Sequence, residues 1–433
     1  MKILVVGSGA REHALAATLA AEPGVTRVVV APGNAGIARS LPVEPLDVAS
    51  PRAILDLAAT LGADLTVIGP EAPLAAGVVD LFQAVGRPVF GPSRAAAALE
   101  TSKAFAKDFM ARHGVPTARH HTATSADEAV RVVRSGALGP AVVVKADGLA
   151  AGKGVVVADD HDEAVQAIRA AIEDRAFGDA GARVVLEERL RGPEVSWFVI
   201  ADGERFVSLQ SAQDHKRIFD DDLGPNTGGM GAFSPSPLMD DDLTAAVTDR
   251  IVRPVLRGMA AEGAPFRGFL YCGLMLTAEG PKVIEFNVRF GDPEAQVVLP
   301  RLAEPLAPLL LAAASGTLRA TPCAFSQDAR VGVVLAAGGY PGTPVTGAPI
   351  AGLEQVAAEC PDVSVFHAGV KPGPGGSLVT GGGRVLTVVG RGARMTDAIA
   401  RAYDAVGRIR FEGMQYRRDI GRKALAADGP PAR

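Results

Sequence analysis

The first 92 residues alternate short runs of β-branched residues with longer alanine-rich runs, and this alternation constrains the fold more than any other feature. The β-branched runs cover residues 3–6, 27–30, 65–68 and 88–90, and the alanine-rich runs cover residues 11–21, 51–61 and 74–85. Strands that alternate with helices form a parallel sheet covered by helices. We therefore expect an N-terminal open parallel α/β domain over residues 1–102.

Three of these expected strands end in loops that contain glycine. The loops read Gly7-Ser8-Gly9-Ala10-Arg11-Glu12, Pro32-Gly33-Asn34-Ala35-Gly36 and Gly69-Pro70-Glu71. In an open parallel sheet such loops meet at the carboxyl edge, where ligands bind, and a helix N-terminus there attracts phosphate. Each loop alone could be a tight turn, but the three together favour a phosphate-bearing substrate. The third glycine of the dinucleotide fingerprint is absent, which disfavours a dehydrogenase.

A glycine-rich loop lies between two expected strands, at residues 141–144 and 155–158. Lys145 stands at the end of the first strand, and the loop contains Gly148, Gly152, Lys153 and Gly154. A lysine before such a loop is suited to covering nucleotide phosphates, because the lysine supplies charge and the loop supplies backbone donors. The loop is not a P-loop, since a strand follows it. A plain flexible hairpin is the alternative.

Residues 283–296 read V-I-E-F-N-V-R-F-G-D-P-E-A-Q and predict a strand with one polar face. Its polar face would carry Glu285, Asn287 and Arg289, and its apolar face Ile284, Phe286 and Val288. We expect the apolar face to lie in the core. A carboxylate and an amide two residues apart can converge on one hard cation such as Mg²⁺. A strand with a solvated polar face is the alternative.

Two further segments carry many charged residues. Residues 213–232 mix charges with glycines, so we expect a functional loop that cannot form core. His215 has no His or Cys at metal-ligand spacing and is expected to be a loop residue rather than a zinc ligand. Glu187 and Glu188 end one expected strand and Glu194 begins the next, so the backbone between them could pair with an adenine edge. A solvated strand end is the alternative for the two consecutive glutamates.

Composition narrows the class of protein. A chain of 433 residues with 48% hydrophobic content can build roughly two to four domains. A net charge of −4 gives no basic field for nucleic acid. Three widely spaced cysteines without a CxxC motif fit a reducing cytoplasm, and neither an export signal nor a membrane-spanning run is present. Residues 327–425 predict a small α+β domain, and residues 426–433 a disordered tail.

These segments resemble the ATP-grasp enzymes and, among them, the phosphoribosylamine–glycine ligase family, over nearly the whole chain. The resemblance rests on G-S-G-A-R-E-H-A-L at 7–15, A-P-G-N-A-G at 31–36, G-P-E-A-P-L at 69–74, K-A-D-G-L-A-A-G-K-G at 145–154, Q-D-H-K-R at 213–217, G-P-N-T-G-G-M-G-A at 224–232 and R-F-G-D-P-E-A-Q at 289–296. The last of these is the most specific. The resemblance implies a central ATP-grasp domain over residues 103–326, with a lid subdomain over about residues 121–190.

The resemblance also implies a reaction. ATP, as co-substrate, would drive ligation of glycine to 5-phosphoribosylamine through a glycyl phosphate, which gives glycinamide ribonucleotide, ADP and phosphate in purine biosynthesis. Such phosphoryl transfer needs positioning and charge neutralisation more than a protein nucleophile. Mg²⁺ or Mn²⁺ would be the cofactor of a cytoplasmic monomer that acts on small molecules, without nucleic acid or membrane partners. The alternatives are another ATP-grasp carboxylate–amine ligase and a non-catalytic nucleotide-binding protein.

By this resemblance, site residues fall into four groups. Glu285 and Asn287 would hold the metal, and the catalytic candidates are Lys145, Asp214, Arg289 and Asp292. Nucleotide binding would use Lys107, Lys145, Gly148, Gly152, Lys153, Gly154, Glu187, Glu188, Leu190 and Glu194. Substrate binding would use Gly7, Gly9, Arg11, Glu12, Gly33, Asn34, Gly36, Pro70, Glu71, Asp214, Lys216, Arg289, Gly291 and Asp292. Many relatives carry another metal-binding carboxylate where this chain reads G-L-M-L at 273–276, so the ligands of a second metal are not indicated.

Overall fold

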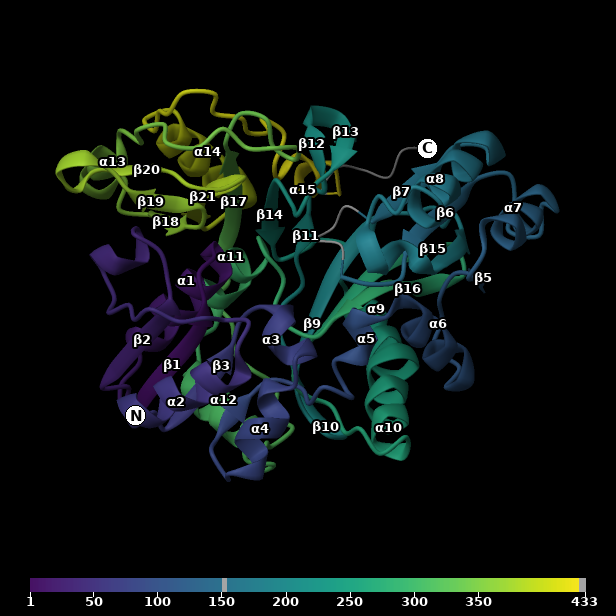
Figure 1. Ribbon diagram of the computed structural model, residues 1–433. Coiled ribbons are helices and arrows are strands. Elements are labelled where there is room, and N and C mark those ends of the chain that lie inside the picture. The colour runs from purple at the N-terminus through teal and green to yellow at the C-terminus, as the bar shows by residue number, and fades with distance from the viewer. Residues whose placement is uncertain (150–153, 428–433) are drawn as a thin grey trace.

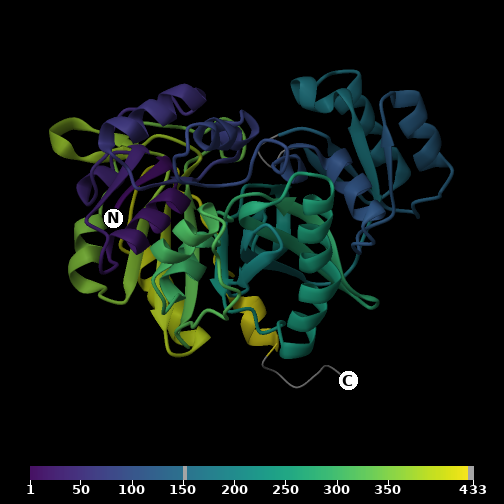
Figure 2. The same ribbon diagram turned by 90° about the horizontal axis from the view of Figure 1, so that it is seen from below.

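The computed structural model describes residues 1–149 and 154–427 of the chain. In Figure 1 the N-terminal lobe (purple) lies beneath the C-terminal lobe (yellow-green), both at the left of the view. A third lobe with helices α7 and α8 projects at the right. Seen from below, this third lobe stands apart from the body of the molecule (Figure 2). Within the described ranges, none of the helices is long and apolar enough to span a bilayer.

The N-terminal sheet has the strand order β2-β1-β3-β4 and is parallel throughout, as predicted. Its strands are β1 (Lys2–Gly7), β2 (Arg27–Pro32), β3 (Leu65–Ile68) and β4 (Val89–Phe90), and the helices are α1 (Ala10–Ala20), α2 (Pro51–Leu61), α3 (Glu71–Ala75) and α4 (Val78–Ala84). The strands are almost wholly buried, because helices cover the sheet. The helix expected over residues 74–85 is divided at Gly77, whose φ of 85° places it in the left-handed region.

Two antiparallel sheets form the central part of the chain. The first, in the order β10-β9-β15-β16, consists of β9 (Glu194–Asp202), β10 (Arg205–Ser208), β15 (Arg267–Thr277) and β16 (Gly280–Asn287), and α5 (Ala98–Thr101), α6 (Lys103–Arg112), α9 (Asp241–Val247) and α10 (Arg253–Ala261) pack with it. The second, in the order β5-β8-β6-β7, consists of β5 (His120–Ala123), β6 (Val142–Ala146), β7 (Val155–Ala158) and β8 (Val184–Glu188). We call the second sheet, with α7 (Ala126–Arg134) and α8 (His161–Ile172), the lid; it has an apolar core of its own.

A five-stranded sheet joins distant parts of the chain in the order β11-β14-β17-β21-β18. Its strands are β11 (Gln213–Asp214), β14 (Gly231–Ser234), β17 (Ala329–Ala336), β18 (Val363–His367) and β21 (Arg384–Gly392), and α13 (Leu353–Glu359) and α14 (Met395–Val406) contribute side chains to its core. We call it the C-terminal sheet. The α+β character expected for the last part of the chain is confirmed, but two of the five strands come from the glycine-rich segment 213–232 and its immediate continuation.

The prediction that residues 213–232 cannot form core was wrong. His215 and Met230 are completely buried, and their backbones pair with each other and with Gly231. Strands β12 (Arg217–Phe219) and β13 (Leu223–Asn226) form a ribbon between these buried positions. His215 is therefore an interior residue, and burial lowers its pKa to about 3, so the ring is neutral. Asp221 and Asp222 of the segment pair with Arg417, Arg422 and Lys423 from the C-terminal end of the chain. Lys216 pairs with Glu194 instead.

The strand β16 departs from strict alternation. A β-bulge interrupts its pairing with β15, so that Gly273 pairs with Glu285 and Leu274 pairs with Val283. Ile284 is the extra residue; it is only partly buried and, like Glu285, lines both cavities of the site described below instead of belonging to the core. Phe286 and Val288 are buried as predicted. The expectation for Ile284 was therefore wrong, because the bulge turns it to the polar face.

The end of the chain is helical further than expected. Helix α15 (Arg422–Ala427) continues two residues into the tail that was predicted to be disordered from residue 426. Ala424 is buried in the apolar cluster of the C-terminal sheet, which anchors the helix. The remaining residues of the expected tail, 428–433, lie outside the described residues.

Arg417 fastens the ribbon β12–β13 to the C-terminal sheet and gives a test of this packing. Its fully buried guanidinium donates to Asp419 at 2.6 and 2.8 Å, to Asp222 at 2.8 Å and to the Arg217 carbonyl at 3.1 Å. Arg417→Met is expected to lower the free energy of unfolding by about 3–5 kcal/mol, because Asp419 stays buried without its cation. The measurement is urea unfolding followed by circular dichroism.

Arg418→Met is the matched control, since Arg418 is exposed and its guanidinium lies over the Tyr416 ring. Its effect is expected to stay within about 0.5 kcal/mol. Equal stability of the two variants would show that the Arg417 network does not hold the ribbon.

Candidate active site

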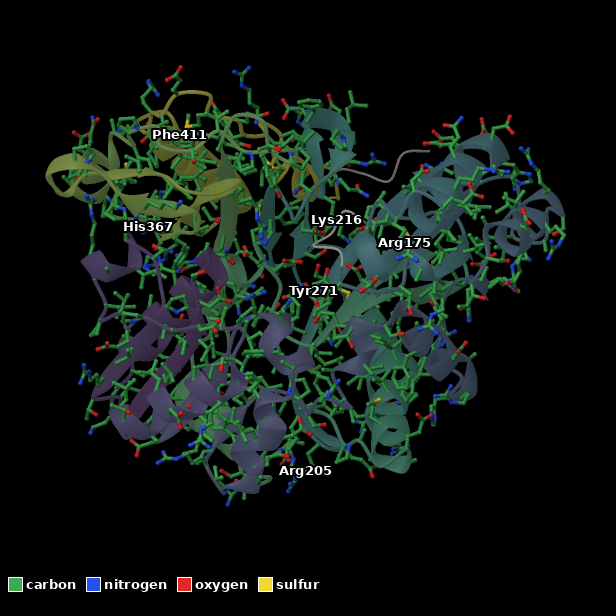
Figure 3. The ribbon with its side chains drawn as sticks, in the orientation of Figure 1. Arg175, Arg205, Lys216, Tyr271, His367 and Phe411 are labelled. Atoms are coloured by element: carbon green, nitrogen blue, oxygen red, sulfur yellow. The ribbon has the colours of Figure 1, made fainter. Side chains whose placement is uncertain are left out.

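Two adjoining cavities lie where the lid, β16 and the C-terminal sheet meet. The larger has a volume of about 730 Å³ and the smaller about 400 Å³. Their walls share Lys145, Glu187, Asp214, Lys216, Ile284 and Glu285, so the two cavities form one connected site. Figure 3 shows Lys216 and Tyr271 at the centre of the molecule, between the C-terminal sheet and the lid.

A buried carboxylate between two lysines forms the wall between lid and body. Glu187 of β8 lies 2.8 Å from Lys145 of β6 and 2.9 Å from Lys107 of α6, and all three side chains are at most 4% exposed. Burial alone would raise the pKa of Glu187, but Lys145 and Lys107 outweigh it and hold that pKa below its usual value. Burial lowers the pKa of Lys107 to about 8, although Glu187 opposes the shift. The three charges sum to one positive charge, which suits an anionic phosphate chain.

The larger cavity has an apolar part and a polar rim. Its apolar lining consists of Val143, Val155 and Val157 of the lid and Met275 of β15, and the segment from Glu187 to Gly192 also lines it. A slot of this kind accepts a flat heteroaromatic base, with backbone groups at its edge for hydrogen bonds. At the rim Glu194 accepts from the Lys216 ammonium at 2.9 Å. The geometry fits the base and sugar of a nucleotide.

Glu285 and Asn287 line the smaller cavity side by side along β16. Burial alone would raise the pKa of Glu285, but Lys216, Lys145 and Lys103 keep it below its usual value, so the carboxylate is ionised. Across the described ranges, no three His, Cys, Asp or Glu side chains gather as a metal site. One carboxylate and one amide oxygen fit a hard cation that takes its other ligands from phosphate and water. Met275 offers only a thioether from the neighbouring strand, which such a cation disfavours.

Arg289 lies in a charged cluster beyond this pair. Its guanidinium lies 3.0 Å from Glu100 of α5 and 3.4 Å from Glu71 of α3. Burial alone would lower the pKa of Arg289, but Glu100 and Glu71 outweigh it and raise the pKa further. Arg11 also lines the smaller cavity, so helices of the N-terminal lobe form this part of the wall.

Asp214 lines both cavities, and its pKa is raised, which favours the neutral carboxyl group. Burial raises its pKa to about 7, and Lys216 opposes that shift while Glu294 adds to it. The Glu294 carboxylate accepts from the Ser196 hydroxyl at 3.1 Å, and Ser196 lies 3.1 Å from the Tyr271 hydroxyl. A carboxyl group with a pKa of about 7 can give or take a proton near neutral pH.

The glycine loops of the N-terminal lobe serve mainly internal contacts. The Gly9 amide donates to Glu12 at 2.7 Å, and both Gly7 and Gly69 lie so close to the Glu12 side chain that neither has room for a Cβ atom. Asn34 donates to the Ser8 and His367 carbonyls and accepts from the amides of residues 36 and 37. Its loop therefore joins the N-terminal lobe to the C-terminal sheet.

Comparison with known families decides the identity. Family models described as the N domain, the ATP-grasp (A) domain and the C domain of phosphoribosylglycinamide synthetase match residues 1–100, 101–295 and 330–423. The chain belongs to the phosphoribosylglycinamide synthetase family. The expected central ATP-grasp fold is thereby confirmed.

Relatives and solved structures agree with this assignment. A phosphoribosylamine–glycine ligase of Streptomyces coelicolor is 52% identical over 429 residues, which is 99% of this chain and 100% of the relative. The crystal structure of phosphoribosylamine–glycine ligase from Thermotoga maritima has a TM-score of 0.83 at 35% identity and covers 97% of this chain and 100% of its own. Biotin carboxylase of Campylobacter jejuni shares the fold, with a TM-score of 0.70 at 17% identity over 99% of this chain and 95% of its own.

Most residues expected at the site of this synthetase family member lie together. The two cavities are lined by Arg11, Pro70, Glu71, Lys107, Lys145, Gly154, Glu187, Glu188, Leu190, Glu194, Asp214, Lys216, Glu285, Asn287, Arg289, Gly291 and Asp292. Their walls do not include Gly7, Gly9, Glu12, Gly33, Asn34, Gly36 or Gly148. Gly152 and Lys153 lie outside the described residues. The individual roles stay predictions.

Several residues of the synthetase site were not predicted from the sequence. Lys103 donates to the Gly148 carbonyl at 3.1 Å and lines the smaller cavity. It lies four residues before Lys107 on α6, and this helical spacing could have indicated it. Glu100, Tyr271 and Arg384 also line the cavity, but they come from unrelated segments without a motif.

The paired lysines of this synthetase predict a pH effect on nucleotide affinity. A lysine must be protonated to attract phosphate, so affinity is expected to fall as pH rises through the Lys107 pKa of about 8. In Glu187→Gln the opposing carboxylate is gone, so the Lys107 pKa is lower and the fall is expected at lower pH. Equilibrium binding of MgADP as a function of pH measures both curves.

Glu173→Gln removes the same charge from the exposed end of α8, where Glu173 pairs with Arg169. This control is expected to keep the wild-type curve. An unchanged curve in Glu187→Gln as well would contradict the coupling between Glu187 and Lys107.

Proposed function

We propose that this chain joins glycine to 5-phosphoribosylamine at the expense of ATP and releases glycinamide ribonucleotide, ADP and phosphate. The reaction is a step of purine biosynthesis. The observation that carries the proposal is the match to phosphoribosylamine–glycine ligases along the full chain, at 52% identity in the Streptomyces coelicolor relative. The connected site supports it, because paired lysines, an ionised Glu285 and a base-sized slot border one space.

The reaction divides into two steps. A glycine carboxylate oxygen attacks the γ-phosphorus of ATP and ADP leaves, which forms glycyl phosphate. The amine of the second substrate then attacks the acyl carbon, phosphate leaves, and the amine loses a proton. Lys107 and Lys145 would hold the phosphates during the first step, and Asp214 could accept the proton in the second, because its pKa is about 7.

ATP-grasp ligases use ATP together with divalent metal ions. We propose Mg²⁺ or Mn²⁺ here, held by Glu285 and Asn287, since oxygen donors of this kind fit a hard cation. Such an ion would neutralise charge on the transferred phosphoryl group. Gly148, Gly152, Lys153 and Gly154 would cover the phosphates, and Glu187, Glu188, Leu190 and Glu194 would border the nucleoside.

The acceptor substrates would bind at the other end of the smaller cavity. We propose Arg11, Pro70, Glu71, Lys216, Arg289, Gly291 and Asp292 for glycine and the amine, with the turns at Gly7, Gly9, Glu12, Gly33, Asn34 and Gly36 supporting that wall. Arg289 and Asp292 would lie near the acyl phosphate. Residues 1–102, 103–326 and 327–425 would be the three domains, with the lid over about residues 121–190. We further propose a cytoplasmic monomer.

An ADP-release assay tests the function. Full turnover is expected only with ATP, glycine and freshly generated 5-phosphoribosylamine together, and omission of any one is expected to abolish it. Turnover with another acid or another amine in place of these substrates would identify a different ATP-grasp ligase. No turnover with any combination, in a protein that binds MgATP, would point to a non-catalytic nucleotide-binding protein.

Glu285→Gln is expected to lower kcat/KM about 100-fold or more, which corresponds to about 3 kcal/mol of transition-state stabilisation. The amide removes the negative charge that the metal needs, while the buried side of β16 is unchanged. Glu279→Gln is the control, because Glu279 is 71% exposed at the turn of the same hairpin. Near-normal turnover of folded Glu285→Gln at saturating magnesium would exclude Glu285 as a metal ligand.

A further inference from the structure

Arg384 reaches from the first residue of β21 into the wall of the smaller cavity. Its guanidinium donates to the Gly228 carbonyl at 2.5 Å, the Asp292 carbonyl at 2.7 Å, the Asp292 carboxylate at 3.0 Å and, more weakly, the Gly229 carbonyl at 3.4 Å. One side chain of the C-terminal sheet therefore holds two segments that are far apart in the sequence.

The glycine-rich segment is held from two sides. The Gly228 amide donates to the Tyr340 hydroxyl at 2.9 Å, while the Gly228 carbonyl accepts from Arg384. Gly229, with a φ of 106°, packs directly on Pro293, so that a Cβ atom there would lie 2.5 Å from the Pro293 ring. The segment thus lies against the loop that carries Asp292, and Arg384 spans the contact.

Asp292 is fixed where the N-terminal lobe meets the C-terminal sheet. Gln296 donates to one carboxylate oxygen at 2.8 Å and Arg384 donates to the other. A Cβ atom at Gly9 of the N-terminal turn would lie 3.7 Å from that second oxygen. Burial alone would raise the pKa of Asp292, but Arg384 and Arg11 outweigh it and keep the group ionised.

The position of Arg384 separates it from the nucleoside end of the site. It lines the smaller cavity together with Arg11, Arg289 and Asp292, and it is not part of the wall of the larger cavity, where the base-sized slot lies. Removal of the Arg384 side chain should therefore weaken binding of the acceptor substrates more than binding of the nucleotide. Nη1 of the Arg384 guanidinium donates to the carbonyls of Gly228 and Asp292, and Nη2 donates to the Asp292 carboxylate. The planar guanidinium fixes the directions of these bonds relative to one another, whereas a lysine ammonium is a single point of charge on a flexible stem.

We propose that Arg384 is a positioning residue for the amine substrate, which sets the Gly228–Gly229 backbone and the Asp292 carboxylate as one wall of the acceptor pocket. The inference rests on the proposed function. It assigns to the C-terminal sheet a direct part in the ligation, in addition to its packing on the N-terminal lobe.

The test compares Arg384→Met, Arg384→Lys and Tyr340→Phe with wild type, each substrate being varied in turn in the ADP-release assay. Arg384→Met is expected to raise the KM for 5-phosphoribosylamine about tenfold or more, with the KM for ATP and the Kd for MgADP within about twofold. Arg384→Lys is expected to recover little of this loss. Tyr340→Phe is expected to shift the same KM in the same direction by a smaller factor.

Arg391→Met is the matched control, because Arg391 lies on the same strand and also pairs with an aspartate, Asp328, at 2.6 Å, but half exposed. It lies seven residues further on, about 23 Å along the strand, and is expected to leave all three KM values unchanged. Urea unfolding of every variant verifies that each is folded.

The outcomes are separable. Wild-type turnover without dependence on 5-phosphoribosylamine would overturn the proposed function and this inference with it. If the wild-type protein depends on 5-phosphoribosylamine, but Arg384→Met and Tyr340→Phe are folded and have normal kinetic constants, the inference alone is overturned. An equal rise in the KM for ATP and for the amine would also overturn it, since it would show a general scaffold role.

Discussion

The site depends on one buried carboxylate, because Glu187 holds two lysines from different parts of the chain in one wall. Lys145 also donates to the Ile284 carbonyl at 2.9 Å, and Lys107 donates to Thr117 at 2.7 Å. The lid and the body of the molecule are thereby joined through charged groups that water hardly reaches. Loss of one member of such a group costs about 3–5 kcal/mol, so the arrangement keeps its geometry even without a bound anion.

The remaining walls of the site follow from the way distant segments share sheets. Strand β16 supplies Glu285 and Asn287, the segment between β11 and β14 supplies Lys216, and the helices of the N-terminal lobe supply Arg11 and Glu71. Each segment is short, but each is fixed by a sheet or helix behind it. A site built in this way is rigid where charge must be placed, and the lid contributes its wall as one unit with an apolar core of its own.

The sequence predicts the local features well and the contacts between distant segments poorly. The parallel N-terminal sheet and the pairing of Glu285 with Asn287 follow from periodicity within a few residues. The bulge at Ile284 depends on the facing strand, so the periodicity of β16 alone could not reveal it. His215 is buried by a sheet that continues only at Ala329, and Arg384 contacts a loop 92 residues away. Only the folded arrangement shows such contacts, because no local pattern encodes them.

The shared C-terminal sheet limits how the gene can be divided. Its strands β17, β21 and β18 follow residue 327, but β11 and β14 lie more than 90 residues earlier. A recombination event or an engineered fusion that cuts the chain between the family's second and third domains would separate β17, β21 and β18 from β11 and β14. The remaining three-stranded sheet would then have an exposed edge at β17. Exchange of this module between homologous enzymes would therefore have to carry residues 213–234 along with the C-terminal part, so the inherited unit is discontinuous in the chain.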